Sequence, residues 1–277
     1  MTDKKVWFIT GASKGLGFEL VNSLLQKGHN VIATSRDVEK LSNLQKENAN
    51  FLAISMEVID EQNVKDAIQK GIHHFGKIDV VVNNAGYGLL GTLEELTITE
   101  IKNCFDVNVF GVINVSKAIL PYFRTQHAGT IINIASVSGS VSATSTGIYS
   151  ATKSAVIQIS EALSSEVEEF GIKVIAVCPG GFRTDFLDKS SMVTAKNEIL
   201  EYKAVRNIIA RLGELNKNQG GDPKKIADVF IKLANMNNPP TRIYLGSDAL
   251  RMMEKKVDSI VNNLKQNQEL SISTDNH

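Results

Sequence analysis

Seven short, nearly unbroken apolar runs are spread along the chain. Such runs are typical of strands that are buried on both faces of a parallel sheet, because an exposed face would show alternating polar residues. We therefore predict strands at residues 6–9, 31–33, 51–54, 80–82, 131–134, 174–177 and 243–245.

Segments with helical patterning fill the intervals between these runs. We predict helices at about residues 15–27, 38–47, 61–75, 99–123, 149–170 and 223–235. Strand and helix alternate throughout, which favours an α/β fold: a doubly wound parallel sheet of about seven strands with helices on both faces. No shift in composition marks a second domain, so residues 1–277 are predicted to form a single Rossmann-type domain.

One stretch, residues 184–222, departs from this alternation. It has helical patches, including residues 197–212, and no predicted strand, where the fold requires only a short connection. An insertion above the carboxyl edge of the sheet lies where ligands bind in open α/β folds. We interpret it as a substrate lid.

The chain continues beyond the last predicted strand with an amphipathic segment. Its apolar residues recur at helical spacing, which predicts a helix that packs one face on the body of the protein or on a neighbouring subunit. These residues are Leu250, Met253, Val257, Ile260 and Leu264. The polar residues 266–277 are predicted to be a frayed, disordered tail.

Charge and composition disfavour several classes of function. Lys+Arg and Asp+Glu both number 30, and no basic block follows the pattern of a phosphate backbone, so we do not expect nucleic acid as a partner. The apolar residues before Thr10 are too few for a signal-peptide core or a membrane span, which predicts a cytoplasmic protein without a membrane partner. Cys104 and Cys178 lie far apart and are expected to be buried, reduced thiols, and we expect no metal site.

A glycine-rich loop directly follows the first predicted strand and opens the first predicted helix. Its sequence is Thr10-Gly11-Ala12-Ser13-Lys14-Gly15-Leu16-Gly17. Glycines allow the backbone to turn tightly and to approach a pyrophosphate at a helix N-terminus, where free N–H groups point outward. The loop therefore predicts a dinucleotide site formed by Gly11, Ser13, Lys14, Gly15, Leu16 and Gly17.

The end of the second strand bears on the choice of dinucleotide. Arg36 offers a planar donor fork for a 2′-phosphate, and Lys14 can add a second positive charge, which favours NADP(H). Asp37 is the competing residue. If the strand end were shifted by one residue, a carboxylate would lie near the ribose and NAD(H) would be the cofactor.

A tyrosine and a lysine share one face of the helix predicted at residues 149–170. Tyr149 lies four residues before Lys153, and Ser136 lies thirteen residues before Tyr149. A further loop, Asn83-Asn84-Ala85-Gly86, follows the fourth predicted strand. With these motifs in this order, the chain resembles the short-chain dehydrogenase/reductase family from about residue 5 to 184, and more weakly to 246.

The resemblance implies roles for further residues. Asn84, Ala85 and Gly86 would support the central strand and line the adenosine side of the cofactor. Asn108 matches the active-site asparagine, which lies at a helix irregularity, and Ser136 matches the catalytic serine. The nicotinamide carboxamide would contact the segment after the sixth strand, where the matching residues are Pro179, Gly180, Phe182 and Thr184.

One position departs from the family pattern. After the third strand the family often has an aspartate and a valine in contact with adenine, and this chain has Glu57 and Val58. The longer side chain of Glu57 keeps the acceptor but moves it by one methylene.

The implied chemistry is a proton transfer that accompanies hydride transfer. Tyr149 is the proton donor, but a free phenol with a pKa of about 10 is a poor acid-base catalyst at neutral pH. The Lys153 ammonium would lower that pKa and bind the nicotinamide ribose. Ser136 would donate a hydrogen bond to the substrate oxygen, and Asn108 would hold a water that links Lys153 to solvent.

The substrate pocket is predicted to be mostly apolar, which suits a lipophilic ketone or alcohol. The candidate lining residues, several of which could instead pack the lid on the body, are Leu89, Leu90, Val137, Val141, Phe182, Phe186, Leu187 and Met192. The insertion and the segment Leu245-Gly246-Ser247-Asp248-Ala249 resemble the steroid-dehydrogenase-like branch of the family.

These features together predict an NADP(H)-preferring short-chain alcohol dehydrogenase or carbonyl reductase. By resemblance, we expect a homodimer or homotetramer that pairs through the helix beginning at Tyr149, where Ala151, Ser154 and Ala155 allow close helix approach. The alternative is a non-catalytic NAD(P)-binding redox sensor. Sensors of that kind typically lack the tyrosine or the lysine, and this chain keeps both.

Overall fold

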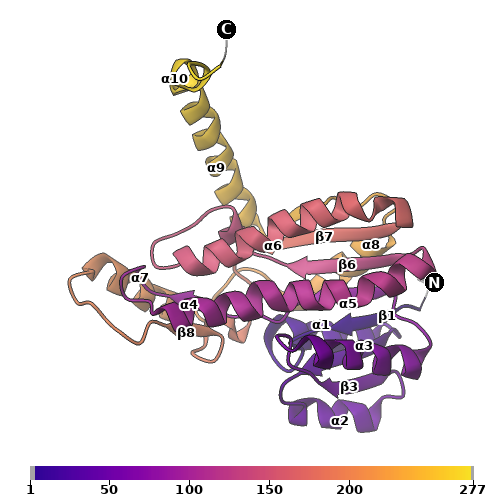
Figure 1. Cartoon of the computed structure of the whole chain (residues 1–277). Helices are drawn as coiled ribbons and strands as arrows, with labels where there is room; N and C mark the ends of the chain where they lie inside the picture. The colour runs from indigo at the N-terminus through magenta and orange to yellow at the C-terminus, as the bar shows by residue number, and fades with distance from the viewer. Residues whose placement is uncertain (1–3, 276–277) are drawn as a thin grey trace.

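A seven-stranded parallel sheet forms the centre of the computed structural model, which describes residues 4–275, apart from the side chains of residues 45–47 (Figure 1). Its strand order is β3-β2-β1-β4-β6-β7-β9. The strands are β1 (Val6–Ile9), β2 (Asn30–Ser35), β3 (Phe51–Ser55), β4 (Val80–Asn83), β6 (Gly129–Ile134), β7 (Ile172–Pro179) and β9 (Arg242–Leu245). All seven strands predicted from the apolar runs are present, and the order reverses between β1 and β4, which confirms the doubly wound α/β fold.

Helices cover both faces of the sheet. One face carries α1 (Gly15–Gln26), α2 (Glu39–Glu47) and α8 (Ile226–Asn235), and the other carries α3 (Glu61–Phe75), α5 (Gly111–Gln126) and α6 (Gly147–Glu166). Successive side chains of β1 alternate between these two cores: Trp7 and Ile9 pack with the first, and Val6 and Phe8 with the second. Because β1 is buried on both sides, its sequence is apolar throughout.

Local sequence signals set the ends of several helices. α3 begins after Asp60, whose carboxylate accepts a hydrogen bond from the Asn63 N–H (2.9 Å). It ends at Gly76, which has a φ of 79° and thus the left-handed conformation that glycine adopts without strain. α4 (Ile98–Phe105) begins with a capping box formed by Thr97 and Glu100.

The helix predicted at residues 99–123 is continuous but irregular. α4 passes through a π-helical turn, η1 (Asp106–Phe110), into α5, and Asn108 lies in that turn, as the resemblance implied. Single π-turns inside α-helices often occur at functional sites. Among the described residues, segment 98–126 is the one helix long and apolar enough to cross a membrane by length and composition, a test that the core helices of soluble proteins also pass. Here its apolar side packs on the sheet.

The insertion predicted at residues 184–222, called the lid below, is present between β7 and α8, but the expectation that it has no strand was wrong. Its role over a substrate stays a prediction. A short strand, β8 (Met192–Thr194), pairs in parallel with β5 (Gly88–Leu90). Between β7 and α8 the chain also forms η4 (Asp185–Leu187), α7 (Lys203–Glu214) and η5 (Pro223–Lys225). At the base of the lid, Phe182 and Gly221 form an isolated parallel β-bridge, so the two ends of the insertion lie side by side.

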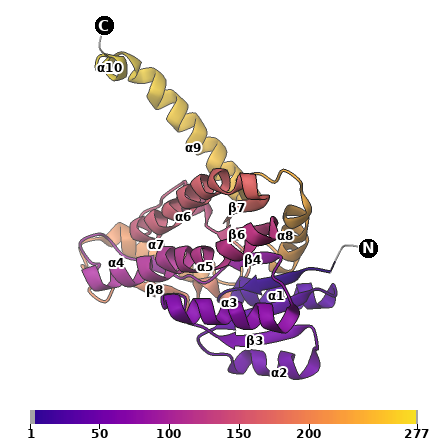
Figure 2. The ribbon, with the colours of Figure 1, turned by 45° about the vertical axis from the view of Figure 1, so that its right-hand side comes forward.

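The last long helix, α9 (Ser247–Gln266), projects from the body of the protein (Figures 1 and 2). Its predicted apolar face is exposed: the side chains of Leu250, Val257, Ile260 and Leu264 are between 45% and 63% accessible. The expected packing on the body was therefore wrong, and packing on a neighbouring subunit stays a prediction. The tail predicted to be frayed forms a short helix, α10 (Gln268–Ile272), and residues 276–277 lie outside the described residues.

Candidate active site

The glycine loop connects β1 to α1 in a conformation that requires its glycines. Gly11 and Gly15 have φ values of 63° and 58°. A Cβ atom on Gly11 would lie 2.7 Å from the Ala85 Cα, and one on Gly17 would lie 2.5 Å from the Asn84 Nδ2. The first N–H groups of α1, which begins at Gly15, have no partner within the helix and can face an anion.

The loop after β4 braces the glycine loop. The Asn84 Nδ2 donates hydrogen bonds to the carbonyl groups of Thr10 (2.9 Å) and Gly11 (3.0 Å), and the Thr10 hydroxyl accepts one from the Ala85 N–H (3.0 Å). The Ser13 hydroxyl accepts a hydrogen bond from Ser35 (2.9 Å), the last residue of β2. Asn84 therefore acts on the glycine loop as well as on the central strand.

Arg36 is the first residue after β2, where a dinucleotide-binding fold positions the residue that recognises the adenosine ribose. Its side chain is 79% exposed, and its Nε lies 3.9 Å from a Glu57 carboxylate oxygen, a weak surface pair. Asp37, the competing residue, accepts a hydrogen bond from the Glu39 N–H (2.9 Å) at the start of α2. This local contact favours Arg36 over Asp37 as the residue that is free to bind a ligand.

Two lysines lie close to Arg36. The Lys14 Nζ donates to the carbonyl (2.8 Å) and the hydroxyl (3.0 Å) of Ser190 in the lid, so in this structure it is bound to the lid. Burial lowers the pKa of Lys14, and the positive charges of Lys40 and Arg36 lower it further. Sequence analysis missed Lys40, which is the second residue of α2 and lies four residues after Arg36. A cavity of about 320 Å³ opens beside these groups and is lined by Ser13, Lys14, Gly15, Phe18, Glu19, Lys40, Arg183, Thr184 and Asp185.

The residues after β3 are ordered by contacts from α3 and α5. The Glu57 N–H donates to the Asn63 side chain (2.7 Å), and the Val58 carbonyl accepts from the Asn114 side chain (3.0 Å). Val58 is buried against Gly111, where a Cβ atom would lie 2.8 Å from the valine. An adenine contact through Glu57 and Val58 stays a prediction.

Tyr149, Lys153 and Ser136 meet at the carboxyl end of β6. Tyr149 and Lys153 are each 6% exposed, on the buried side of α6. Ser136 caps η2 (Val137–Gly139) by accepting from the Ser138 N–H (3.1 Å), and its hydroxyl is close enough to the Tyr149 phenol to lower the phenol's pKa. The Lys153 Nζ donates to the Ile134 carbonyl (2.7 Å) and lies 5.9 Å from the centre of the Tyr149 ring.

Burial is the largest cause of the pKa shifts of Tyr149 and Lys153. It raises the pKa of Tyr149, and the hydrogen bond from Ser136 opposes that shift only in part. It also lowers the pKa of Lys153 to about 8. Burial is the largest cause of the raised Tyr149 pKa, and the lowering by Lys153 that the resemblance implied stays a prediction.

The buried ammonium of Lys153 predicts a pH dependence of stability. Between about pH 8 and 10.5 the unfolded chain binds this proton and the folded chain does not, so the free energy of unfolding should rise with pH in this window. Cys104 and Cys178 act in the opposite sense, because burial raises their pKa values to about 11 and about 12. The difference between the pH dependences of wild type and Lys153→Met therefore gives the contribution of the lysine.

Urea unfolding at pH 7 and at pH 9.5 gives the change in the free energy of unfolding between these two pH values. We expect this change to be about 2 kcal/mol more positive for wild type than for Lys153→Met. Parallel pH dependences of the two proteins would show that the lysine keeps an ordinary pKa when folded.

Asn108 is fully buried, and its amide group ties three elements together. Its Oδ1 accepts from the Tyr87 N–H (2.9 Å), and its Nδ2 donates to the Tyr87 carbonyl (2.9 Å) and to the Thr152 hydroxyl (3.1 Å). A Cβ atom on Gly86 would lie 3.0 Å from the Asn108 Oδ1 and 3.5 Å from the Lys153 Nζ, so this glycine keeps the two side chains accessible to each other. The water contact expected of Asn108 stays a prediction.

The segment after β7 lies against the glycine loop. The Gly180 N–H donates to the Leu245 carbonyl (2.8 Å), and the Thr184 hydroxyl accepts from the Phe186 N–H (3.3 Å). Thr184 approaches Gly15, where a Cβ atom would lie 4.0 Å from the threonine Cβ. The structure therefore brings the two predicted cofactor segments together.

One aromatic residue of the lid lies beside the cluster of Tyr149, Lys153 and Ser136. The rings of Phe186 and Tyr149 have centres 6.0 Å apart, and Met192 packs directly against Gly88. Leu89 instead packs into a small core with Leu96, so it supports the lid rather than lining a free pocket. Phe186 and Met192 both lie next to Gly88, and Phe186 connects them to Tyr149.

Buried carboxylates fix the lid to the start of α4, a feature that sequence analysis missed. The Glu95 side chain is fully buried and accepts hydrogen bonds from the N–H groups of Thr92 (2.8 Å) and Ile199 (2.9 Å), and it pairs with Arg206 in α7. Burial alone would raise the pKa of Glu95, but these hydrogen bonds outweigh it and hold the pKa at about 2. The lid is therefore held in a defined position at neutral pH.

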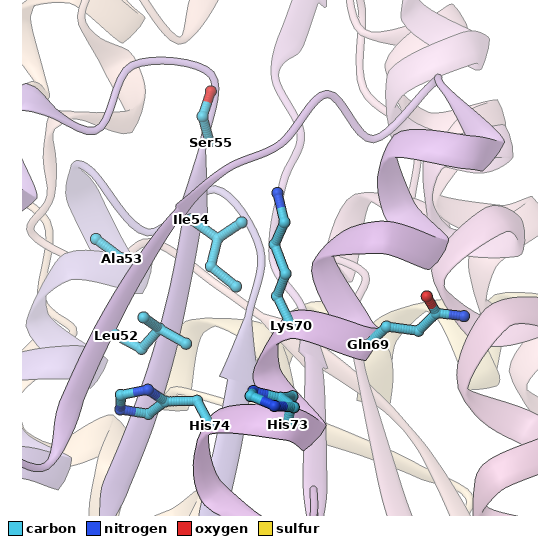
Figure 3. A pocket seen from close by; sticks show the side chains of 8 residues that line it. All are labelled: Leu52, Ala53, Ile54, Ser55, Gln69, Lys70, His73 and His74. Carbon is cyan, nitrogen blue, oxygen red and sulfur yellow. The ribbon is translucent and has the colours of Figure 1, made fainter.

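A larger cavity, of about 590 Å³, lies outside this cluster (Figure 3). It is lined by Leu52, Ala53, Ile54, Ser55, Gln69, Lys70, His73 and His74. These residues come from β3, at one edge of the sheet, and α3, and they include none of the predicted site residues. Within residues 4–275, no cluster of three potential metal ligands occurs.

Known families and proteins resemble this chain over most of its length. The family model described as short chain dehydrogenase matches residues 5–193. "Oxidoreductase BOA17" of Botryotinia fuckeliana is 35% identical over 98% of this chain and 99% of its own, and the "3-ketodihydrosphingosine reductase" of Bacteroides thetaiotaomicron is 36% identical over 95% of each. A crystal structure of a short-chain dehydrogenase from Streptomyces avermitilis, 34% identical, covers 99% of this chain and 100% of its own with a TM-score of 0.91.

Two further solved structures contain a nicotinamide cofactor. ElxO with NADP bound is 28% identical and has a TM-score of 0.74 over 90% of this chain and 99% of its own. The 3-ketoacyl-(acyl-carrier-protein) reductase of Brucella melitensis, in complex with NADH, is 25% identical and has a TM-score of 0.73 over 88% of this chain and 97% of its own. These neighbours support the binding of a nicotinamide cofactor by this fold.

Proposed function

Since this chain belongs to the short-chain dehydrogenase family, we propose that it is an NADP(H)-preferring oxidoreductase that interconverts a carbonyl and an alcohol. The observation that carries the proposal is the meeting of Tyr149, Lys153 and Ser136 in one buried cluster at the carboxyl end of β6. Ligands bind at that edge of open α/β sheets.

The residues present fit a nicotinamide dinucleotide. The glycine loop leaves free N–H groups and no side chain where a pyrophosphate would approach, and the exposed guanidinium of Arg36 has only a weak partner. Arg36 and Lys40 would hold the 2′-phosphate, and the segment 179–184 would hold the nicotinamide end. Lys14 would have to leave Ser190 to join them. When bound, NADP(H) supplies or accepts the hydride.

The chain itself supplies the proton and positions the substrate oxygen. Tyr149 keeps its proton at neutral pH because burial raises its pKa, so it is ready to donate to a carbonyl oxygen that gains negative charge. Ser136, whose hydroxyl acts on the pKa of the same phenol, would donate a hydrogen bond to the same substrate oxygen. Lys153 places a positive charge 5.9 Å from the phenol ring and so stabilises the phenolate that remains.

We propose an apolar carbonyl compound as substrate. The ring of Phe186 lies beside Tyr149, and Met192 lies next to Phe186 at Gly88, so both are apolar neighbours of the proposed proton donor. A relative named 3-ketodihydrosphingosine reductase, 36% identical, adds long-chain ketones to the compounds worth testing. The likeness to the steroid-dehydrogenase-like branch stays a prediction, and so does a cytoplasmic location.

Binding and turnover measured separately test this function. Fluorescence titration with NADPH and NADH gives cofactor affinity, and loss of absorbance with a panel of ketones, aldehydes and long-chain keto compounds gives turnover. We expect tighter binding of NADPH and turnover with at least one apolar ketone. Tight binding without any turnover would favour the redox-sensor alternative.

The exposed apolar face of α9 supports a homo-oligomer. Its apolar residues recur at intervals of three and four along the helix, the spacing with which two helices pack against each other. On α6, Ala151 is exposed and available for close helix approach. We therefore propose that copies of this chain associate and that α9 contributes to the contact.

Substitutions that introduce charged residues on the apolar face of α9 should lower the mass of the oligomer. Light scattering after gel filtration should give at least twice the 30.2 kDa chain mass for wild type. It should give a smaller mass for the double variant Val257→Asp, Ile260→Asp. Lys255→Asp, on the same helix but outside the apolar row, is the matched control. An unchanged mass in the double variant would exclude α9 from the contact.

A further inference from the structure

The corner between β9 and α9, which the mechanism above does not use, contacts the segment proposed to hold the nicotinamide. Asp248 lies in the first turn of α9, and its Oδ2 accepts a hydrogen bond from the Gly181 N–H (2.7 Å). One residue earlier, the Gly180 N–H donates to the Leu245 carbonyl (2.8 Å). Two successive peptide groups of the loop after β7 are thus bound to this corner.

Glycines surround the Asp248 carboxylate closely. A Cβ atom on Gly180 would collide with both of its oxygens, and one on Gly246, where φ is 107°, would lie 2.5 Å from its Oδ1. On Gly181 a Cβ atom would lie 3.5 Å from its Oδ2. The neighbouring Ala249 is fully buried and fixes this turn of α9 in the protein. The carboxylate therefore has a defined place, which leaves no room for a side chain at Gly180 or Gly246, whereas a Cβ atom at Gly181 would only make ordinary contact.

This contact restricts a loop that glycine would otherwise leave free. Gly180 and Gly181 lie between Pro179 and the residues Phe182 and Thr184, and consecutive glycines have more backbone freedom than other residues. A hydrogen bond to a carboxylate is stronger than one between neutral groups. The bond from Gly181 to Asp248 is consequently well suited to hold the loop in one conformation.

We propose that Asp248 is a positioning residue for the nicotinamide half of the cofactor. By accepting the Gly181 N–H, it holds the segment 179–184 in the shape that receives the nicotinamide, and it touches neither substrate nor cofactor itself. The proposal rests on the proposed function, since it concerns the same cofactor site. It assigns a role to the motif Gly246-Ser247-Asp248 that the sequence alone did not explain.

Variants of Asp248 are tested for binding of NADPH and of a ligand that contains only its adenosine half. The comparison separates positioning of the nicotinamide half from a general effect on stability. For Asp248→Ala we expect the dissociation constant of NADPH to rise about tenfold, which corresponds to about 1.4 kcal/mol. The affinity for adenosine 2′,5′-bisphosphate, which lacks the nicotinamide half, should stay within about twofold of wild type, since Asp248 contacts neither the glycine loop nor Arg36. Fluorescence titration measures the first and calorimetry the second.

Two further variants complete the test. In Asp248→Asn the amide oxygen can still accept the Gly181 N–H, so NADPH affinity should recover to within about threefold of wild type. Asp258→Ala removes an exposed carboxylate from the same helix and should change neither affinity. Hydrogen exchange of the peptide that contains Gly181 should become faster in Asp248→Ala without cofactor.

Three results would overturn the proposal in different ways. Wild-type affinity for NADPH in Asp248→Ala would show that the contact does not position the cofactor. Equal losses for NADPH and the bisphosphate, with a lowered melting temperature, would show a general structural role. A wild-type chain that binds neither NADPH nor NADH would overturn the proposed function, and the positioning role with it.

Discussion

Replacing Tyr149 with phenylalanine is expected to remove turnover while NADPH remains bound. Phenylalanine keeps the ring that packs 6.0 Å from the ring of Phe186, so the buried cluster should stay filled. It lacks the hydroxyl that lies near Ser136 and that would donate the proton. General acid catalysis contributes about 10²- to 10⁴-fold to the rate of such reactions, and we expect a loss of kcat of that size.

A tyrosine outside the site provides a matched control for this prediction. Tyr122→Phe removes a hydroxyl on α5 that contacts only the Gly76 carbonyl at 3.4 Å, and it should leave kcat and NADPH affinity unchanged. Steady-state turnover and fluorescence titration on the three proteins give both quantities. If Tyr149→Phe turned over at the wild-type rate, another group would have to donate the proton.

Replacing Arg36 with alanine is expected to weaken the binding of NADPH about 30-fold, or about 2 kcal/mol, and to leave the binding of NADH almost unchanged. The guanidinium follows β2 directly, is 79% exposed and has only a weak ion pair with Glu57, so it can form charge-assisted hydrogen bonds to a 2′-phosphate. NADH lacks that phosphate. Its binding should depend instead on the glycine loop and on the segment 179–184, which the substitution leaves intact.

Paired titrations with NADPH and NADH check this selectivity. Arg124→Ala, an exposed arginine near the end of α5, is the control and should change neither affinity. Lys40→Ala should also weaken the binding of NADPH, because the positive charge of Lys40 is close enough to Lys14 to affect the pKa of Lys14. Equal losses for both cofactors in Arg36→Ala would defeat the assignment of Arg36 to the 2′-phosphate.

The sheet could be predicted from the sequence because burial on both faces leaves a plain apolar run at each strand. Strands β5 and β8 could not, since each has three residues and exists only by pairing with a segment far away in the chain. The spacing of Leu250 to Leu264 indicated a helix with an apolar face, but such a pattern does not say what the face contacts. In the structure that face is exposed.

The meeting of Ser136, Tyr149 and Lys153 beside the glycine loop could be predicted because each motif follows the carboxyl end of a strand or opens a helix at that edge of the sheet. The contacts of Asp37 and Lys14 could not, because the first depends on a local turn with Glu39 and the second on the position of the lid. Glu95 and Asp248 were missed because their partners, Ile199 and Gly181, lie far away in the chain. Isolated carboxylates carry no motif that would indicate such contacts.

Transfer of deuterium from NADPH to product tests the central claim most directly. NADPH deuterated at C4, in each of its two stereochemical forms, is incubated with the protein and with the ketone panel, and the products are analysed by mass spectrometry. The account predicts an alcohol that carries one deuterium from one of the two forms with wild type, and none above background with Tyr149→Phe. Reduced products without deuterium from either form, or no reduced product despite bound NADPH, would contradict it.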